Sequence, residues 1–172
     1  MRAYATLARI RRHYAARLNS SVRRRKRGTM SALRFPEHFP PKDRWGKFFI
    51  GVRWLGPDLS FFKTLKTAQA QRAAQELTAW GGGARQTLAH AISRVLARSL
   101  GWKSEVFLPE DSAAVVFHGP RYDFSDPESA FAEVVEMLAI DFRIVVPESF
   151  WARYAEASFG EIIDALLNER AA

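Results

Sequence analysis

The sequence predicts an all-helical protein. Over residues 84–170, apolar side chains recur every three to four positions in four separate stretches, which is the periodicity of amphipathic helices. Serine, proline and glycine stand where such helices would begin and end. Aromatic and basic residues concentrate earlier in the chain. We therefore expect a four-helix bundle over 84–170, an aromatic-rich helical extension over 30–83 and a basic segment over 1–29.

The first helix of the bundle is expected over residues 85–100. Gly101 follows it, at the position where a helix C-terminus favours glycine. A long connection over residues 102–124 comes next. The apolar residues of this helix fall on one stripe, which consists of Leu88, Ala91, Ile92, Val95, Leu96 and Leu100.

The second helix is expected to begin at Ser125. The four residues Ser125-Asp126-Pro127-Glu128 fit a capping box with proline in the first turn. Its predicted buried face consists of Phe131, Val134, Val135, Leu138 and Phe142. The acidic residues lie off that face and give the helix an acidic side, made of Glu128, Glu133, Glu136 and Asp141.

Two shorter helical segments complete the bundle. Residues 147–154 carry three aromatic side chains and predict a short third helix. Ser158 is the expected cap of the fourth helix, whose apolar stripe consists of Phe159, Ile162, Ile163, Leu166 and Leu167.

The extension over residues 30–83 is interrupted by proline and glycine. Residues 45–62 are rich in aromatic side chains, which either pack on the core of the bundle or form an exposed interface. Residues 60–79 predict one further helix, with Ser60 as its cap. The three glycines at 81–83 predict a flexible joint before the bundle.

The N-terminal segment is strongly basic. Residues 1–36 hold eleven basic residues and no acidic one, whereas residues 86–172 hold seven basic and fourteen acidic residues. Residues 1–19 show the spacing of a short amphipathic helix, with the apolar stripe Tyr4, Leu7, Ile10, Tyr14 and Leu18. An unbroken run of five cations follows, Arg23, Arg24, Arg25, Lys26 and Arg27.

Several roles fit this segment. Residues 2–27 are suited to anionic lipid or to phosphate groups, to a partner protein, or to an organellar transit peptide. Alternatively, translation starts at Met30, where the composition changes sharply.

The composition excludes several classes of chemistry. The chain has no cysteine, its four histidines lie far apart, and no apolar run reaches 18 residues. We therefore expect no disulfide, no metal site and no membrane-spanning helix. Motifs of serine hydrolases, zinc proteases and nucleotide-binding loops are absent. We expect a non-enzymatic protein that does not bind nucleic acid and lies in the cytoplasm, with a peripheral membrane position as the alternative.

Residues 85–168 resemble the acyl carrier protein family. AISRVLARSLGWKSEVFLPEDSAAVVF is similar to the first helix and following loop of a carrier protein. EVVEMLAIDFRIVVPES resembles the end of its acidic second helix, and SFGEIIDALL resembles its last helix. The resemblance implies a four-helix carrier-like fold. It also implies a second helix whose acidic residues meet basic surfaces of partner proteins.

One carrier motif is missing. Carrier proteins attach 4′-phosphopantetheine to the serine of a D-S-L motif at the start of the second helix, where free backbone N–H groups favour a phosphodiester. This chain has no such motif, and Glu128 occupies the aligned position. Ser129 lies one residue later and Ser125 three residues earlier. A shift of one residue turns a helical side chain by about 100°.

These observations predict a non-catalytic, carrier-like interaction module without a prosthetic arm. Its partner would be a protein with a basic surface, bound through Glu128, Glu133, Glu136 and Asp141. One alternative is an atypical carrier modified at Ser129 or Ser125 with phosphopantetheine as its cofactor. Another is a peripheral membrane or anion-binding protein that uses the basic N-terminus.

Overall fold

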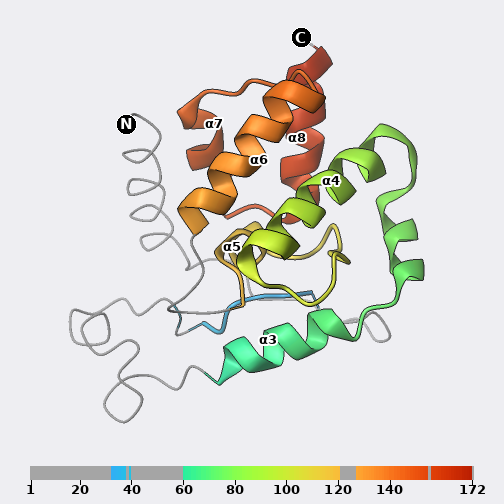
Figure 1. Cartoon of the computed structure of the whole chain (residues 1–172), viewed down its shortest axis with the longest axis vertical. Coiled ribbons are helices and arrows are strands. Elements are labelled where there is room, and N and C mark those ends of the chain that lie inside the picture. The colour runs from blue at the N-terminus through green and yellow to red at the C-terminus, as the bar shows by residue number, and fades with distance from the viewer. Residues whose placement is uncertain (1–31, 38, 40–59, 121–126, 155, 172) are drawn as a thin grey trace, which may run out of the picture.

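The computed structural model describes residues 32–37, 39, 60–120, 127–154 and 156–171, without the side chains of residues 127, 128, 170 and 171. All regular structure within these residues is helical (Figure 1), which confirms the predicted all-helical class for this part of the chain. The helices are α3 (Phe61–Ala70), η1 (Ala74–Trp80), α4 (Gly83–Leu100), α5 (Ala113–His118), α6 (Pro127–Asp141), α7 (Glu148–Arg153) and α8 (Phe159–Ala171).

Helix α4 is the central element, and it packs against both α6 and α8 (Figure 1). The predicted stripe on this helix is confirmed except at Ala91, which is half-buried and lies beside the open side of the helix, whereas Leu88, Ile92 and Leu96 are fully enclosed. Val134 of α6 and Ile163 of α8 are equally enclosed beside them. Burial of such aliphatic side chains is the main stabilising contribution to a helical core.

Helix α8 begins as its sequence predicts. The Ser158 Oγ accepts the backbone N–H of Glu161, and the Glu161 carboxylate accepts the backbone N–H of Ser158. This reciprocal pair is a capping box, and it satisfies two backbone donors that would otherwise lack a partner. Helix α7 starts after Pro147, close to its predicted position.

The predicted buried face of α6 is wrong at one residue. Val134 and Leu138 are enclosed and Phe131 is half-buried, but 37% of Val135 is exposed. Val135 lies about 100° around the helix from Val134. That rotation places it at the edge of the packed face, beyond the reach of α4.

The single helix predicted over residues 60–79 is also wrong, because the structure divides it in two. Helix α3 ends at Ala70, Ala73 takes an extended conformation, and the 3-10 helix η1 begins at Ala74. Ser60 makes no side-chain cap for α3. The break turns Arg72 into the protein interior, where it meets Asp111.

Asp111 is a fully buried acidic residue with four hydrogen bonds. Its carboxylate accepts two from the Arg72 guanidinium, at 2.5 and 2.8 Å. It also accepts the backbone N–H groups of Leu33 and Leu108, at 2.8 and 2.7 Å. A buried charge is tolerated only when it is paired and hydrogen-bonded in this way. Asp111 therefore joins residue 33, the break after α3 and the connection that follows α4.

Further contacts hold the extension against this connection. Gln69 and Ser104 exchange hydrogen bonds through the Gln69 side chain and the Ser104 backbone. The indole of Trp80 donates to the carbonyl of Phe107 at 2.9 Å and meets the ring of Phe159 edge-on. The described parts of residues 30–83 thus pack on the connection between α4 and α6, rather than standing apart from it.

The three glycines at 81–83 form the turn between η1 and α4. All three have positive φ, a conformation that residues with a Cβ adopt only at a cost. Gly81 ends η1 in the left-handed region, and Gly82 precedes the first residue of α4. The turn positions the buried Trp80 beneath the start of α4.

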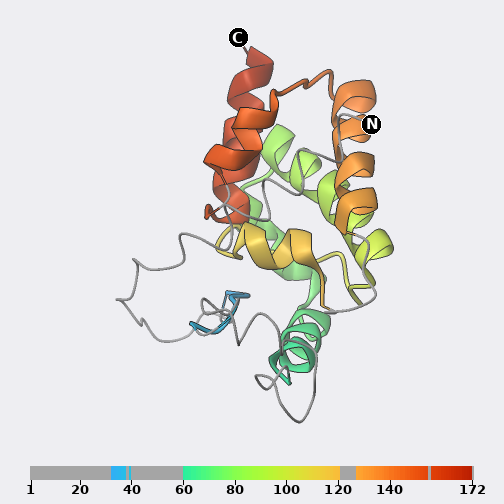
Figure 2. The same cartoon turned by 90° about the vertical axis from the view of Figure 1, so that its left-hand side faces the viewer.

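The connection between α4 and α6 contains a helix that the sequence did not reveal. Helix α5 has only six residues and packs against α4, α6 and α8. Its last residue, His118, lies against the rings of Phe35, Phe39 and Phe62. The cluster therefore joins the end of α5 to α3 and to the segment around residue 35, which lie at the same end of the molecule in Figure 2. Residues 45–59 of the predicted aromatic stretch lie outside the described part of the chain.

Candidate docking surface

Helix α6 presents an outer face that no described element covers. Ser129, Ala132, Glu136, Ala139 and Ile140 are all exposed. With about 100° of rotation per residue, these positions fall within roughly one third of the helix circumference. The opposite side carries Ala130, Val134 and Leu138, which are enclosed beneath α6. We call the exposed residues Ser129, Ala132, Val135, Glu136, Ala139 and Ile140 the α6 outer face.

Only one of the four predicted acidic docking residues is described on this face. Glu136 is exposed and has no ion pair with any described residue. Asp141 is exposed too, but it ends the helix about 140° around from Glu136. The side chain of Glu128 lies outside the described part of the structure. Of the three acids whose side chains the structure describes, Glu136 and Asp141 therefore lie on different sides of α6.

Glu133 already contacts two other residues of the same chain. It forms an ion pair with Arg98 of α4, and it accepts a hydrogen bond from Ser99 Oγ at 2.6 Å. These contacts lie along the seam between α4 and α6. A carboxylate that is already paired attracts a basic partner less strongly, so Glu133 contributes little to an outward docking surface.

Apolar side chains extend the outer face, and the sequence analysis missed them. Ile140 is 68% exposed, and Val145 in the connection after α6 is 81% exposed. Arg143 lies between them with φ of 57°, a left-handed conformation in which the chain leaves the helix. The spacing of Ile140 from Leu138 places it off the buried stripe. That spacing was the available signal.

Of the two serines predicted as sites of modification, only Ser129 belongs to the described part of the chain. Ser129 is exposed and is the third residue of α6, within the first turn of the helix. Ser125 lies outside the described residues. The basic run from Arg23 to Arg27 also lies outside them, as does all of residues 1–31.

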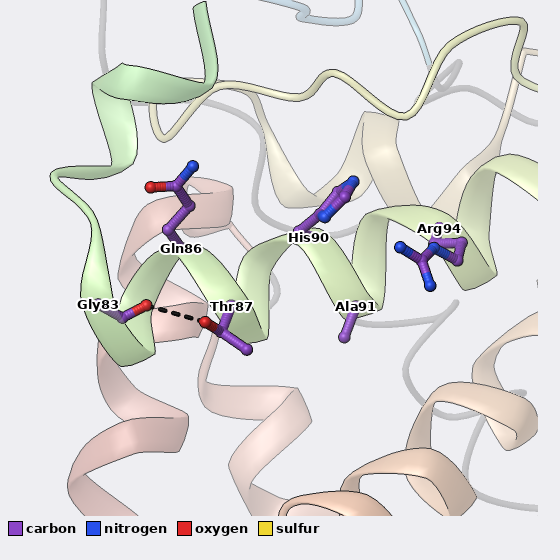
Figure 3. A pocket seen from close by; sticks show the side chains of 6 residues that line it. All are labelled: Gly83, Gln86, Thr87, His90, Ala91 and Arg94. Atoms are coloured by element: carbon purple, nitrogen blue, oxygen red, sulfur yellow. Dashed lines mark hydrogen bonds between the residues drawn. The ribbon is translucent and has the colours of Figure 1, made fainter. Parts of the chain in front are cut away.

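Helix α4 carries an open groove of about 430 Å³ on its exposed side (Figure 3). Figure 3 shows Gln86 and His90 rising from one side of the helix and Ala91 pointing to the other. The described residues that line the groove all come from α4, namely Gly83, Gln86, Thr87, His90, Ala91 and Arg94.

The groove lacks the arrangement that nucleophilic catalysis requires. Its hydroxyl group, Thr87 Oγ1, donates to the carbonyl of Gly83 at 3.0 Å (Figure 3). His90 Nε2 lies 3.2 Å from Glu105 Oε2, and Arg94 lies 3.7 Å from the same oxygen. No hydroxyl contacts the imidazole among these interactions, so the groove offers no nucleophile and base pair.

The cationic side chains of α4 all have acidic partners. Besides Arg94 and Arg98, Arg85 forms a two-point contact with Asp164 of α8, at 2.6 and 3.0 Å. The hydrogen bonds that Arg85 donates to Asp164 raise the pKa of the Arg85 guanidinium above its ordinary value. A raised pKa of a cation gives stability that is lost only when the pH climbs through that pKa. Arg85 therefore stays positively charged at any ordinary pH.

The described residues can be compared with the requirements of a metal site and of a membrane-spanning helix. They contain no group of three or more side chains that could hold a metal ion. Among the helices that the structure describes, none combines the length and the apolarity needed to cross a bilayer. Compared with known proteins, the chain matches no family model, no curated protein sequence and no solved structure.

Proposed function

We propose that this chain is a non-catalytic interaction module of the acyl-carrier-like type, which binds a basic surface of a partner protein through α6. The observation that carries this proposal is the contrast in how charge is used. The cations of α4 are paired within the chain, whereas Glu136 faces outward beside the exposed Ile140. An exposed acid next to exposed apolar side chains is the composition of a docking surface.

The carrier-like part of the proposal is supported by the order and packing of the helices. A long helix, a long connection, a second helix, a short helix and a final helix follow one another from α4 to α8. The first of them packs on the second and on the last. This order and packing support the carrier-like proposal, and the sequence did not indicate the six-residue helix α5 within the connection.

The acidic and the apolar side chains of the outer face would contribute to binding in different ways. Glu136 would steer a basic partner and select its orientation, because exposed charges act mainly on the encounter rate and on specificity. Val135 and Ile140 would supply affinity through burial of apolar surface. Because Glu133 is paired with Arg98, the acidic contribution is smaller than the four acids of the sequence suggest.

The proposal is tested by partner capture with the full chain in three forms. The wild type is compared with Glu136→Lys and with Glu169→Lys, which reverses an exposed acid on α8 and makes the same change in net charge. A partner that docks on α6 is retained by Glu169→Lys and lost by Glu136→Lys. Equal capture by all three forms would contradict the proposal.

An atypical acyl carrier is the second candidate, and one observation favours it. Ser129 is exposed in the first turn of α6, close to where carrier proteins bear their modified serine. The test is the intact mass after co-expression with a broad-specificity phosphopantetheinyl transferase. A mass gain of one pantetheine arm that Ser129→Ala or Ser125→Ala alone removes identifies a working carrier. An unchanged mass leaves the docking module.

The third candidate, a peripheral membrane or anion-binding protein, depends on residues 2–27. These residues lie outside the described part of the chain, so the structure adds no observation for it. It predicts salt-sensitive binding to anionic vesicles through Arg23 to Arg27. A cytoplasmic location, with or without membrane contact, is proposed with it on the sequence alone.

A further inference from the structure

We propose that the α6 outer face is covered by the chain's own N-terminal segment, residues 2–18, until a partner displaces it. This inference rests on the proposed function, because it assigns the regulation of the same docking surface. It names one occupant, a basic amphipathic stretch within the same molecule.

The outer face has the shape and chemistry that a second helix needs. Ala132 and Ala139 are exposed and lie seven residues apart, which places them on one line along α6. Small side chains at such positions allow a packed helix to approach closely. Val135 flanks this line on one side, and Ile140 and Glu136 flank it on the other. An apolar strip is thereby bordered by an acid.

The N-terminal sequence is complementary in each of these respects. Its stripe of Tyr4, Leu7, Ile10, Tyr14 and Leu18 predicts an apolar face at helical spacing. Its remaining positions include several arginines and no acid. As a helix, seventeen residues would span about 25 Å, against about 22 Å for the fifteen residues of α6. The two segments are therefore matched in length as well as in polarity.

The distribution of charge also favours contact between the N-terminal segment and α6. Residues 1–36 contain eleven basic residues and no acid, whereas residues 86–172 contain seven basic and fourteen acidic residues. The cations of α4 already neutralise Glu105, Glu133 and Asp164. Glu136 has no such pair among the described residues, so it is the acid on the α6 outer face that the described structure leaves available to an incoming arginine.

The connection is long enough for the segment to reach α6. Leu33 is fixed next to α5, because its backbone N–H donates to Asp111 and its carbonyl accepts from Ser112. Helix α5 in turn packs against α6. Residues 19–31 can bridge up to about 43 Å. A tethered partner acts at an effective concentration of millimolar order, so even a weak contact would be populated.

The absence of cysteine makes a direct test possible in the full chain. A single thiol is introduced by Ala139→Cys in the centre of the outer face, and its rate of labelling by a maleimide is measured. The same thiol is then measured together with Leu7→Asp and Ile10→Asp, which remove the apolar stripe. We expect these two substitutions to accelerate labelling at least about tenfold, given the tethered concentration.

Ala70→Cys is the matched control, since Ala70 is an exposed alanine at the end of α3, a helix that lies apart from α6 in both views (Figures 1 and 2). Its labelling rate should not change when Leu7 and Ile10 are replaced. An Ala139→Cys rate that is equally fast with and without the N-terminal substitutions would overturn the inference.

A second measurement identifies the occupant. The variant with Ile10→Cys and Ala139→Cys is oxidised under dilute conditions and separated by mass. A disulfide within a monomer supports the proposal. A covalent dimer assigns the face to a second copy, and failure to form either product places the N-terminal segment elsewhere, for example on a membrane. Both of these results overturn the inference.

Failure of this inference is separable from failure of the proposed function. If the thiol at position 139 is freely accessible but partner capture still depends on Glu136, only the covering segment is excluded. If the thiol is protected and no partner depends on Glu136, the α6 docking function is excluded, and the contact with residues 2–18 remains as a purely internal one.

Discussion

Helices α4 and α6 pack side by side, but they differ in how many of their charged side chains form ion pairs within the chain. On α4, Arg85, Arg94 and Arg98 each contact an acid from another part of the chain. On α6, Glu133 is paired in the same manner, but Glu136 has no ion pair among the residues that the structure describes. The difference separates charges that organise the fold from charges that are available to a partner. Experiments that remove one or the other should have very different effects.

The largest effect on stability is expected for the buried ion pair between Arg72 and Asp111. Arg72→Met would leave the fully enclosed Asp111 without its counter-ion, and an uncompensated buried charge costs about 3–5 kcal/mol. Urea denaturation of the wild type and the variant measures this loss. Arg34→Met is the control, because Arg34 is exposed and should leave the midpoint nearly unchanged. A loss below about 1 kcal/mol would show that Asp111 is not held as described.

The next largest effect is expected where α5 ends against α4. A Cβ at Gly119 would lie 2.9 Å from Leu100 Cβ, and the φ of Gly119 is +86°. Gly119→Ala therefore combines a steric clash with a strained backbone, and we expect a destabilisation of about 2–3 kcal/mol. Gly81→Ala is the matched control, since it has positive φ and open space. Equal destabilisation of the two variants would mean that the clash with Leu100 is absent.

A gain in stability is expected at the end of α6. Arg143 holds a left-handed conformation at φ 57°, which glycine adopts without steric cost. Arg143→Gly should stabilise the protein by roughly 0.5–1 kcal/mol, visible as a higher denaturation midpoint. Arg153→Gly, in the exposed part of α7, should instead destabilise it, because glycine is unfavourable within a helix. An unchanged or lower midpoint for Arg143→Gly would contradict the assignment.

The smallest effects on stability are expected for the acids of α6. Glu133→Ala removes a largely exposed ion pair and a hydrogen bond from Ser99, and we expect a loss of about 0.5–1 kcal/mol. Glu136→Ala should change the free energy of unfolding by less than about 0.5 kcal/mol, because Glu136 has no ion pair with any residue that the structure describes. The two substitutions are compared by denaturation in the same buffer. If Glu136→Ala were the more destabilising, the contrast between the two acids would be wrong.

The helices of the bundle were predictable because local rules determine them. The stripe of α4 and the capping box of α8 depend on residues three to four apart, so their signals are complete within a short window. The exposed position of Val135 was not predictable, because it depends on how far α4 covers α6. The acidic side of α6 was identified, but its division into a paired Glu133 and an outward Glu136 depends on Arg98 of another helix.

The break after α3 was missed for a related reason. The composition of residues 60–79 favours a continuous helix, and Arg72 has the helical propensity to continue it. The buried Asp111 lies 39 residues later, and the contact between them outweighs that local preference. Asp111 itself carried no signal in the sequence that marked it as the partner of Arg72. Helix α5 was missed because six residues are too few to show a periodicity.

The position of Asp111 also sets an order of events during synthesis. Its carboxylate binds a backbone amide 78 residues earlier and a guanidinium 39 residues earlier, so both groups leave the ribosome well before their acceptor. Leu33 and Arg72 cannot make these contacts until Asp111 has been synthesised. Contacts between residues so distant in sequence are also slow to form. A nascent chain that stops before Asp111 would expose its extension to proteolysis. One that continues past the end of α5 would begin to protect it.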